Sequence, residues 1–200
     1  MNTREMDKLI AHFNKYFQQG DPVILHPVAM DPHIDVLKYE PTETYPFWKL
    51  TTMGASDHKM NGTNQLGDRN EYIMFIGADE DLDDKEVFEW YRAQLLEVAL
   101  YPFASDGFLS YGHSVEWAPE ADEEMVGAFL ELPQIIRDAG LLRCKLGWLK
   151  TAICLQVTLL NRAEMDRLLE IGPQAFSEYL YPEAGGPGHY LSQRKRTDAF

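Results

Sequence analysis

The sequence predicts an α+β domain in which helices pack on a mixed, mainly antiparallel sheet. Helical and β-rich apolar stretches follow one another in the order helix, strands, helix, strands, helices. The strict strand–helix alternation that is typical of a doubly wound parallel sheet is absent. In 200 residues, 45% are hydrophobic, which is enough for a core without disulfides or structural metal.

Two longer helices are predicted in the first half of the chain. The first has an N-terminal cap at Asn2 or Thr3 and a stop at Gly20. The second follows the acidic run 79–84, where carboxylates lie at the positive end of the helix dipole, and it ends before Pro102.

The second half of the chain predicts two further helices. Asn161 caps the first of them, with Glu164 in the capping-box position, and Gly172 ends it. We expect its core-facing residues to be Met165, Leu168, Leu169 and Ile171. Pro173 suits the first turn of a short fourth helix.

Stretches rich in β-branched and aromatic residues, bounded by Gly, Pro or polar residues, predict the strands. They cover residues 23–25, 33–39, 47–53, 71–76, 112–117, 126–132, 145–149 and 152–160. We expect one domain over residues 1–182. A Gly/Pro-rich and then basic tail over 183–200 is expected to be partly ordered against that domain.

The charge of the chain narrows the class of partner. With 32 acidic and 18 basic residues, the net charge of −14 repels phosphate backbones and anionic lipid surfaces. We therefore expect no nucleic acid and no membrane partner. A basic protein partner is favoured because opposite charge speeds encounter, although acidity that serves solubility alone is the alternative.

Cysteine usage and the N-terminal segment predict a cytoplasmic protein. Cys144 and Cys154 lie among apolar neighbours without a Cys-x-x-Cys pair, which indicates buried free thiols in a reducing compartment. Residues 1–20 lack the apolar core of a signal peptide. Apolar runs of the length needed to cross a bilayer are also absent.

Polar residues that interrupt the β-rich stretches are the candidate chemical groups. His33 and Asp35 fall on one face of a strand, and Asp57, His58 or His113 could complete a metal-ligand set. That set would suit metal-assisted hydrolysis, in which a metal-bound water attacks. The alternative is that these side chains satisfy backbone groups at turns, as Asp commonly does.

The role in satisfying backbone groups at turns is favoured over a metal site, because the spacings of these residues match no metal motif. The chain also has no nucleophile elbow and no phosphate-binding loop. We expect no catalytic residue, no metal and no cofactor. Five aromatic residues flank or occupy regular segments, and most are expected in the core, with one or two near a sheet edge as partner anchors. They are Phe47, Trp48, Trp90, Trp117 and Trp148.

The stretch 33–60, HIDVLKYEPTETYPFWKLTTMGASDHKM, resembles the suppressor-of-fused (SUFU) domain family. Its matching residues are His33, Asp35, Tyr39, Pro41, Phe47, Trp48, Leu50, Thr52, Gly54, Ser56, Asp57 and Met60. Further similar stretches are LLEVALYPF, YGHSVEW and CLQVTLLNRAEMDRLLEIG, so the resemblance runs from about 22 to 181. The size of the chain is similar to that of stand-alone bacterial members.

The resemblance implies a mixed α/β fold and a non-enzymatic binding role. Animal members sequester Gli transcription factors, and bacterial members are thought to be immunity proteins that neutralise toxin domains. A protein partner, such as a basic toxin domain, is therefore expected here. The resemblance implies partner-binding residues at Ser56, Asp57 and Trp48. It implies structural motif residues at His33, Asp35, Gly54 and His113.

Overall fold

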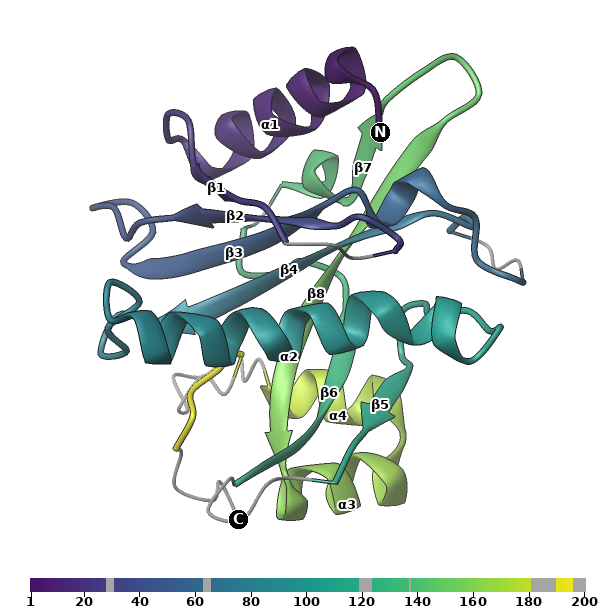
Figure 1. Cartoon of the computed structure of the whole chain (residues 1–200). Helices are drawn as coiled ribbons and strands as arrows, with labels where there is room; N and C mark the ends of the chain where they lie inside the picture. The colour runs from purple at the N-terminus through teal and green to yellow at the C-terminus, as the bar shows by residue number, and fades with distance from the viewer. Residues whose placement is uncertain (28–30, 63–65, 119–123, 137, 181–189, 196–200) are drawn as a thin grey trace.

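The computed structural model describes residues 1–27, 31–62, 66–118, 124–136, 138–180 and 190–195. Over these residues, helices surround one eight-stranded sheet (Figure 1). The helices are α1 (Thr3–Phe17), α2 (Lys85–Ala104), α3 (Arg162–Ile171) and α4 (Pro173–Leu180), with 3-10 turns η1 (Ala55–Asp57) and η2 (Ala139–Leu142). The strands are β1 (Val23–Leu25), β2 (Asp35–Tyr39), β3 (Phe47–Met53), β4 (Asn70–Gly77), β5 (Ser114–Glu116), β6 (Met125–Glu131), β7 (Arg143–Lys145) and β8 (Thr151–Asn161).

The sheet is mixed and mainly antiparallel, as the sequence predicts. Its strand order is β1-β2-β3-β4-β8-β6-β5, and β7 pairs with β8 outside this path. Strands β4 and β8 run parallel, and the other pairs in the described part of the chain run antiparallel. A parallel pair needs a crossover, and the chain between β4 and β8 supplies it through α2 and the strands β5 to β7.

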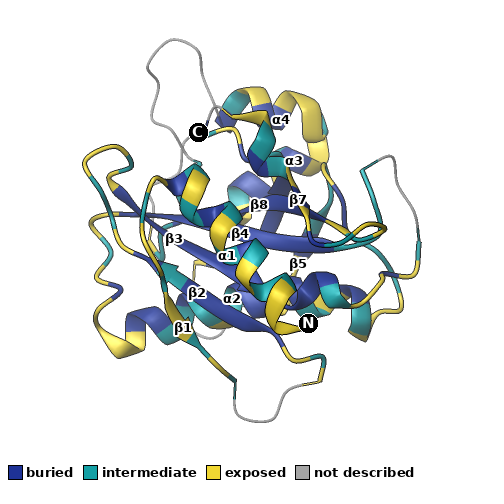
Figure 2. Cartoon of the chain, turned by 90° about the horizontal axis from the view of Figure 1, so that it is seen from above, coloured by how far each residue is buried: buried dark blue, intermediate teal, exposed yellow. Residues whose placement is uncertain are grey.

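Helices cover both faces of the sheet. Figures 1 and 2 show α1 on one face and α2 on the other. Because side chains alternate along a strand, Val36 of β2 packs in the core under α2, whereas Leu37 packs in the core under α1. The α1 stripe of Leu9, Phe13 and Phe17 is fully buried, and each such side chain contributes about 1.5–3 kcal/mol.

The ends of the first two helices differ from the prediction. Asn2 caps α1 and forms a capping box with Glu5. The helix ends at Gln18, in a left-handed conformation with φ 52°, and not at Gly20. Helix α2 continues through Pro102 to Ala104. Proline lacks an N–H, so one hydrogen bond is missing near the end of the helix, and the residue is buried.

Helix α3 begins as predicted, with a capping box between Asn161 and Glu164. Met165 and Leu168 are buried, but the prediction for Leu169 is wrong, because 67% of that residue is exposed. The buried stripe is narrow, and Leu169 lies about 100° around the helix from Leu168.

The strand predicted over 145–149 is also wrong. The strand is Arg143–Lys145, and the following residues turn back into β8. The backbone N–H groups of Leu146 and Gly147 both donate to the carbonyl of Lys150, which closes this turn. Figure 1 shows the β7–β8 hairpin extending beyond the sheet near the N-terminus.

The described part of the predicted tail lies against β4. The N–H of Ser192 donates to the carbonyl of Phe75 over 2.8 Å, and Ser192 forms an isolated parallel bridge with Ile76. The rest of the tail lies outside the described residues, as does most of the acidic loop 120–124. Among the residues described, no helix is long and apolar enough to cross a membrane.

Candidate functional site

The Gly-x-Ser-Asp segment that follows β3 is organised by one buried carboxylate. Glu71 of β4 accepts hydrogen bonds from the hydroxyls of Thr52 and Ser56, both at 2.6 Å. It also accepts hydrogen bonds from the backbone N–H groups of Gly54 and Ser56, both at 3.0 Å. Burial raises the pKa of Glu71, although these donors act to lower it. Glu71 therefore fixes the path of the chain from β3 into η1.

Gly54 is required by the backbone at this corner. Its φ of 125° is rarely adopted by other residues, and an added Cβ would lie 2.6 Å from the carbonyl oxygen of His33. The same corner is held from outside by Arg69, whose Nη1 donates to the carbonyls of Ser56 and Asp57 over 2.8 and 2.6 Å. As a result, the side chain of Asp57 projects from a rigid turn.

Asp57 joins this turn to the β7–β8 hairpin. Its Oδ1 lies 2.6 Å from Nζ of Lys150, and its Oδ2 accepts a hydrogen bond from the N-terminal ammonium of Met1. Burial acts to raise the pKa of Asp57, but the hydrogen bonds from Lys150 and the amine outweigh it and lower the pKa to about 2. Lys150 also reaches Glu5 of α1 over 3.1 Å. The carboxylate is therefore charged at neutral pH and anchors the base of the hairpin.

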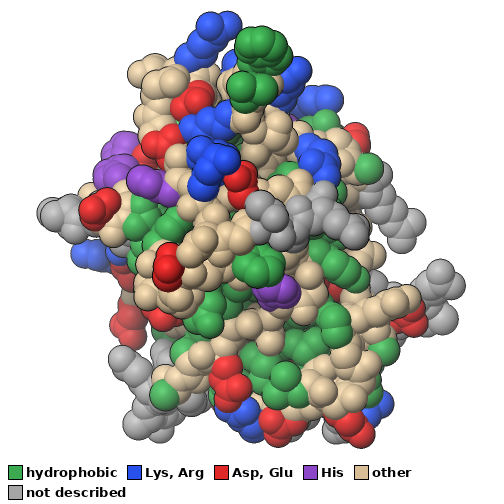
Figure 3. Space-filling view, turned by 90° about the vertical axis from the view of Figure 1, so that its right-hand side faces the viewer, with side chains coloured by type: hydrophobic (Ala, Val, Ile, Leu, Met, Phe, Trp, Pro, Cys, Tyr) green, Lys and Arg blue, Asp and Glu red, His purple; other side chains and the backbone are tan. Residues whose placement is uncertain are grey.

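Beyond Lys150, the hairpin tip exposes two large apolar side chains. Trp148 and Leu149 are 89% and 90% exposed, the highest values among the exposed large hydrophobic residues of the described chain. Figure 3 shows Lys and Arg side chains around an apolar projection at the top of this face. A hollow of about 310 Å³ lies beside the tip. Its lining includes Lys59, Leu66, Arg69, Leu149, Lys150 and Ile153. We call Asp57, Trp148, Leu149 and this hollow the hairpin surface.

A second polar cluster lies near the β1–β2 edge. Oδ1 of Asp35 lies 2.8 Å from Nδ1 of His26 and 2.9 Å from Nε2 of His33. The side chain of Asp35 is 5% exposed, whereas those of His26 and His33 are 62% and 56% exposed. The structure thus brings His33 and Asp35 together as predicted, and it adds His26.

The other candidates for a hydrolytic metal set lie elsewhere. Asp57 pairs with Lys150, the His58 ring packs on Phe103 at 5.8 Å, and the His113 ring packs on Phe108 at 5.2 Å. In the described part of the chain, the one cluster of potential metal ligands contains neither Asp57 nor His113. Within the described residues, neither Asp57 nor His58 nor His113 therefore joins His33 and Asp35 in a metal-ligand set.

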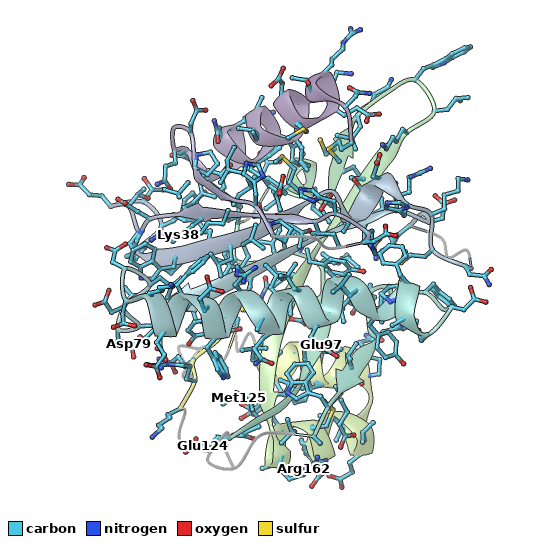
Figure 4. The ribbon with its side chains drawn as sticks, in the orientation of Figure 1. Lys38, Asp79, Glu97, Glu124, Met125 and Arg162 are labelled. Carbon is cyan, nitrogen blue, oxygen red and sulfur yellow. The ribbon has the colours of Figure 1, made fainter. Side chains whose placement is uncertain are left out.

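The three predicted partner-binding residues do not share one surface. Ser56 is fully buried against Glu71. Trp48 is 7% exposed, and its Nε1 donates to the carbonyl of Glu80. Its neighbour Lys38, with Nζ 5.2 Å from the indole, lies at the end of the sheet away from the hairpin (Figure 4). Of the three, Asp57 offers a partly exposed side chain, at 31%.

Sequence reasoning missed several residues of these two clusters. The sequence places Trp148 among aromatics expected mostly in the core, and no pattern in it indicates a role for Lys150 or His26. Gly147 before Trp148 is a turn signal that could have placed the tip of a hairpin at this point. No comparable signal places His26 beside Asp35, because the two residues approach through strand pairing.

Comparisons with known proteins identify the fold and the family. The family profile described as Suppressor of fused protein (SUFU) matches residues 30–191. No curated protein matches the chain. Solved structures also match, and three of them have TM-scores of 0.66 to 0.69.

The first structure is the Sufu-Fu complex, with 14% identity over 96% of this chain and 91% of that chain, at a TM-score of 0.66. The second is Drosophila Suppressor of Fused, with 12% identity, at 0.69; the match covers 96% of this chain and 50% of that one. The third is described as a SUFU homologue from Neisseria gonorrhoeae FA 1090, with 14% identity over 98% and 96%, at 0.66. These TM-scores show a common fold, and the profile match over most of the chain shows that the protein belongs to the SUFU family.

Proposed function

We propose that this chain is a non-enzymatic protein-binding module that holds its partner on the hairpin surface. The observation that carries the proposal is the exposure of Trp148 and Leu149 at the tip of a braced hairpin. Large apolar side chains on a rigid support are typical anchors of protein interfaces, where tryptophan is enriched among the residues that dominate affinity. Support also comes from the family, since one structure of similar fold is the Sufu-Fu complex.

The rigidity of the support favours binding by shape. Lys150 links Asp57 to Glu5, and Lys8 donates to the carbonyl of Leu146 over 2.6 Å, so both sides of the hairpin base are tied down. A pre-organised surface loses less conformational entropy when it binds. Asp57, the partly exposed member of the predicted binding set, lies at the base of this surface.

Two of the lysines near the tip form ion pairs within the chain. Lys59 pairs with Asp68 over 2.8 Å, and Lys150 pairs with Asp57 over 2.6 Å. The tip itself would therefore make mainly apolar contacts. The net charge of −14 acts at longer range and favours encounter with a basic protein.

For the partner, we propose a basic toxin domain that this chain neutralises in the cytoplasm as an immunity protein. The charge supports a basic partner, and the two buried free thiols, Cys144 and Cys154, suit a reducing compartment. The test is co-expression with toxin proteins encoded next to this chain, followed by purification of the complex and a toxicity assay. A stable complex with loss of toxicity is expected. If a complex forms but the toxin stays active, the chain sequesters a partner and is not an immunity protein. If no complex forms, both roles are contradicted.

A further inference from the structure

The geometry near the β1–β2 edge points to a second site, and we propose that His26, His33 and Asp35 bind a divalent transition-metal ion of the Zn²⁺ type. One carboxylate oxygen of Asp35 lies 2.8 Å from Nδ1 of His26 and 2.9 Å from Nε2 of His33. The three potential ligand atoms all lie within 4.8 Å of one another. Three donors therefore converge on one point from three side chains.

The donor set selects the class of ion. Two imidazole nitrogens with one carboxylate oxygen suit Zn²⁺ and its neighbours Co²⁺, Ni²⁺ and Cu²⁺, whereas Mg²⁺ and Ca²⁺ prefer oxygen alone. Ligand atoms at about 2.0–2.1 Å from a tetrahedral ion lie roughly 3.3 Å apart. The two nitrogen–oxygen separations, 2.8 and 2.9 Å, are somewhat shorter than that value, so small rotations of the exposed rings would admit the ion.

The burial pattern supports binding over a purely structural hydrogen-bond pair. The carboxylate is 5% exposed, and within the described residues the two histidines, rather than a Lys or Arg, lie within hydrogen-bond distance of it. The histidine side chains are 62% and 56% exposed, so an ion can reach them from solvent. With three protein ligands, a fourth position stays open to water or to another ligand.

The position of the ligands gives the ion a role in the fold. His26 directly follows β1, Asp35 is the first residue of β2, and His33 lies two residues before it, so the ion would link the two strands. Strand β1 forms the edge of the sheet and pairs with β2 over three residues, Val23–Leu25. We infer that the bound ion ties this short edge strand to the sheet. This role needs no protein partner and no chemical reaction.

The experiment is a titration of the full chain with Zn²⁺ by isothermal calorimetry, and with Co²⁺ followed by visible absorption. We expect one ion per chain, a dissociation constant in the micromolar range or tighter, and Co²⁺ bands typical of nitrogen and oxygen ligands. The variants His26→Ala and His33→Ala should each weaken binding at least tenfold. Their exposed side chains make both changes compatible with folding.

The matched control is His58→Ala, because His58 is also exposed and lies outside the cluster. Hydrogen exchange at the β1 amides supplies a second readout. Zn²⁺ should slow exchange there in the wild type and in His58→Ala, but not in His26→Ala. Absence of saturable binding would overturn the proposal. So would equal binding by wild type and His26→Ala, or an equal loss in His58→Ala.

Discussion

The ammonium of Lys150 lies 2.6 Å from the carboxylate of Asp57, 93 residues away in the sequence. This pair joins the turn after β3 to the β7–β8 hairpin, two segments that carry the family motif and the exposed tip, respectively. The side chains are 18% and 31% exposed, so solvent screens the pair only in part. The hairpin surface therefore depends on a contact that neither segment makes alone.

Removing the charge of Asp57 should destabilise the protein in a pH-dependent way. Its pKa is lowered from 3.8 to about 2, so the stabilisation is complete above pH 4 and is lost as the pH falls toward 2. We expect Asp57→Asn to reduce the free energy of unfolding by about 1 kcal/mol at pH 7 and by almost nothing at pH 2. Urea denaturation at both pH values measures this.

The control for this prediction is Glu97→Gln, which neutralises an exposed carboxylate on α2 (Figure 4). It should change the free energy of unfolding little at either pH. A double-mutant cycle with Lys150→Met should then give a favourable coupling energy between Asp57 and Lys150. Additive effects of the two substitutions would contradict the proposed link.

Glu71 should be needed for the corner that follows β3. Glu71→Ala leaves the N–H groups of Gly54 and Ser56 and the hydroxyls of Ser56 and Thr52 without their buried acceptor. We expect a loss of about 3 kcal/mol or more in the free energy of unfolding, because each unpaired buried group costs energy. Glu71→Gln retains one carbonyl acceptor and should cost less. Equal losses in the two variants would show that the carbonyl oxygen of Gln does not replace a carboxylate oxygen here, and a small loss in Glu71→Ala would contradict the role of Glu71 at this corner.

The left-handed backbone of Gly54 should make it intolerant of a side chain. Gly54→Ala combines a φ of 125° with a Cβ placed 2.6 Å from the carbonyl oxygen of His33. Thermal and urea unfolding should show a loss of more than about 2 kcal/mol. Gly20→Ala is the control, because no atom lies within 4 Å of its added Cβ. A similar small effect of both changes would contradict the strain at Gly54.

Buried Lys49 should give the protein a distinctive alkaline pH profile. Burial lowers its pKa from 10.5 to about 8, so between these values the unfolded chain binds more protons than the folded protein. Stability from this group therefore rises with pH from 8 to 10.5. We expect the free energy of unfolding of the wild type, relative to that of Lys49→Met, to increase by about 1–2 kcal/mol over this pH range.

Comparing the two proteins at each pH removes the contributions of the tyrosines and cysteines, which both share. Lys85→Met, which changes an exposed lysine on α2, should show no such trend. A difference between wild type and Lys49→Met that stays constant from pH 8 to 10.5 would contradict the lowered pKa.

Local patterns predicted most of the elements but not the sites. The β-branched and aromatic run 47–53 and the capping box at Asn161 are local signals, and the structure has both elements where they were predicted. By contrast, Lys150 meets Asp57, and His26 meets Asp35, through tertiary contacts that no periodicity encodes. Apolar character alone predicts a core position for Trp148. The residue instead lies in an exposed turn that is closed by backbone hydrogen bonds to the carbonyl of Lys150.

The most direct test of the proposed function is the affinity of the purified complex between this chain and the toxin protein that co-purifies with it. The double variant Trp148→Ala/Leu149→Ala should weaken that affinity about 100-fold. Because both side chains are exposed, the free energy of unfolding should change by less than about 0.5 kcal/mol. Leu169→Ala, on an exposed face of α3 at the opposite end of the molecule, should bind like the wild type (Figure 1). Unchanged affinity in the folded double variant would contradict partner binding by the hairpin surface.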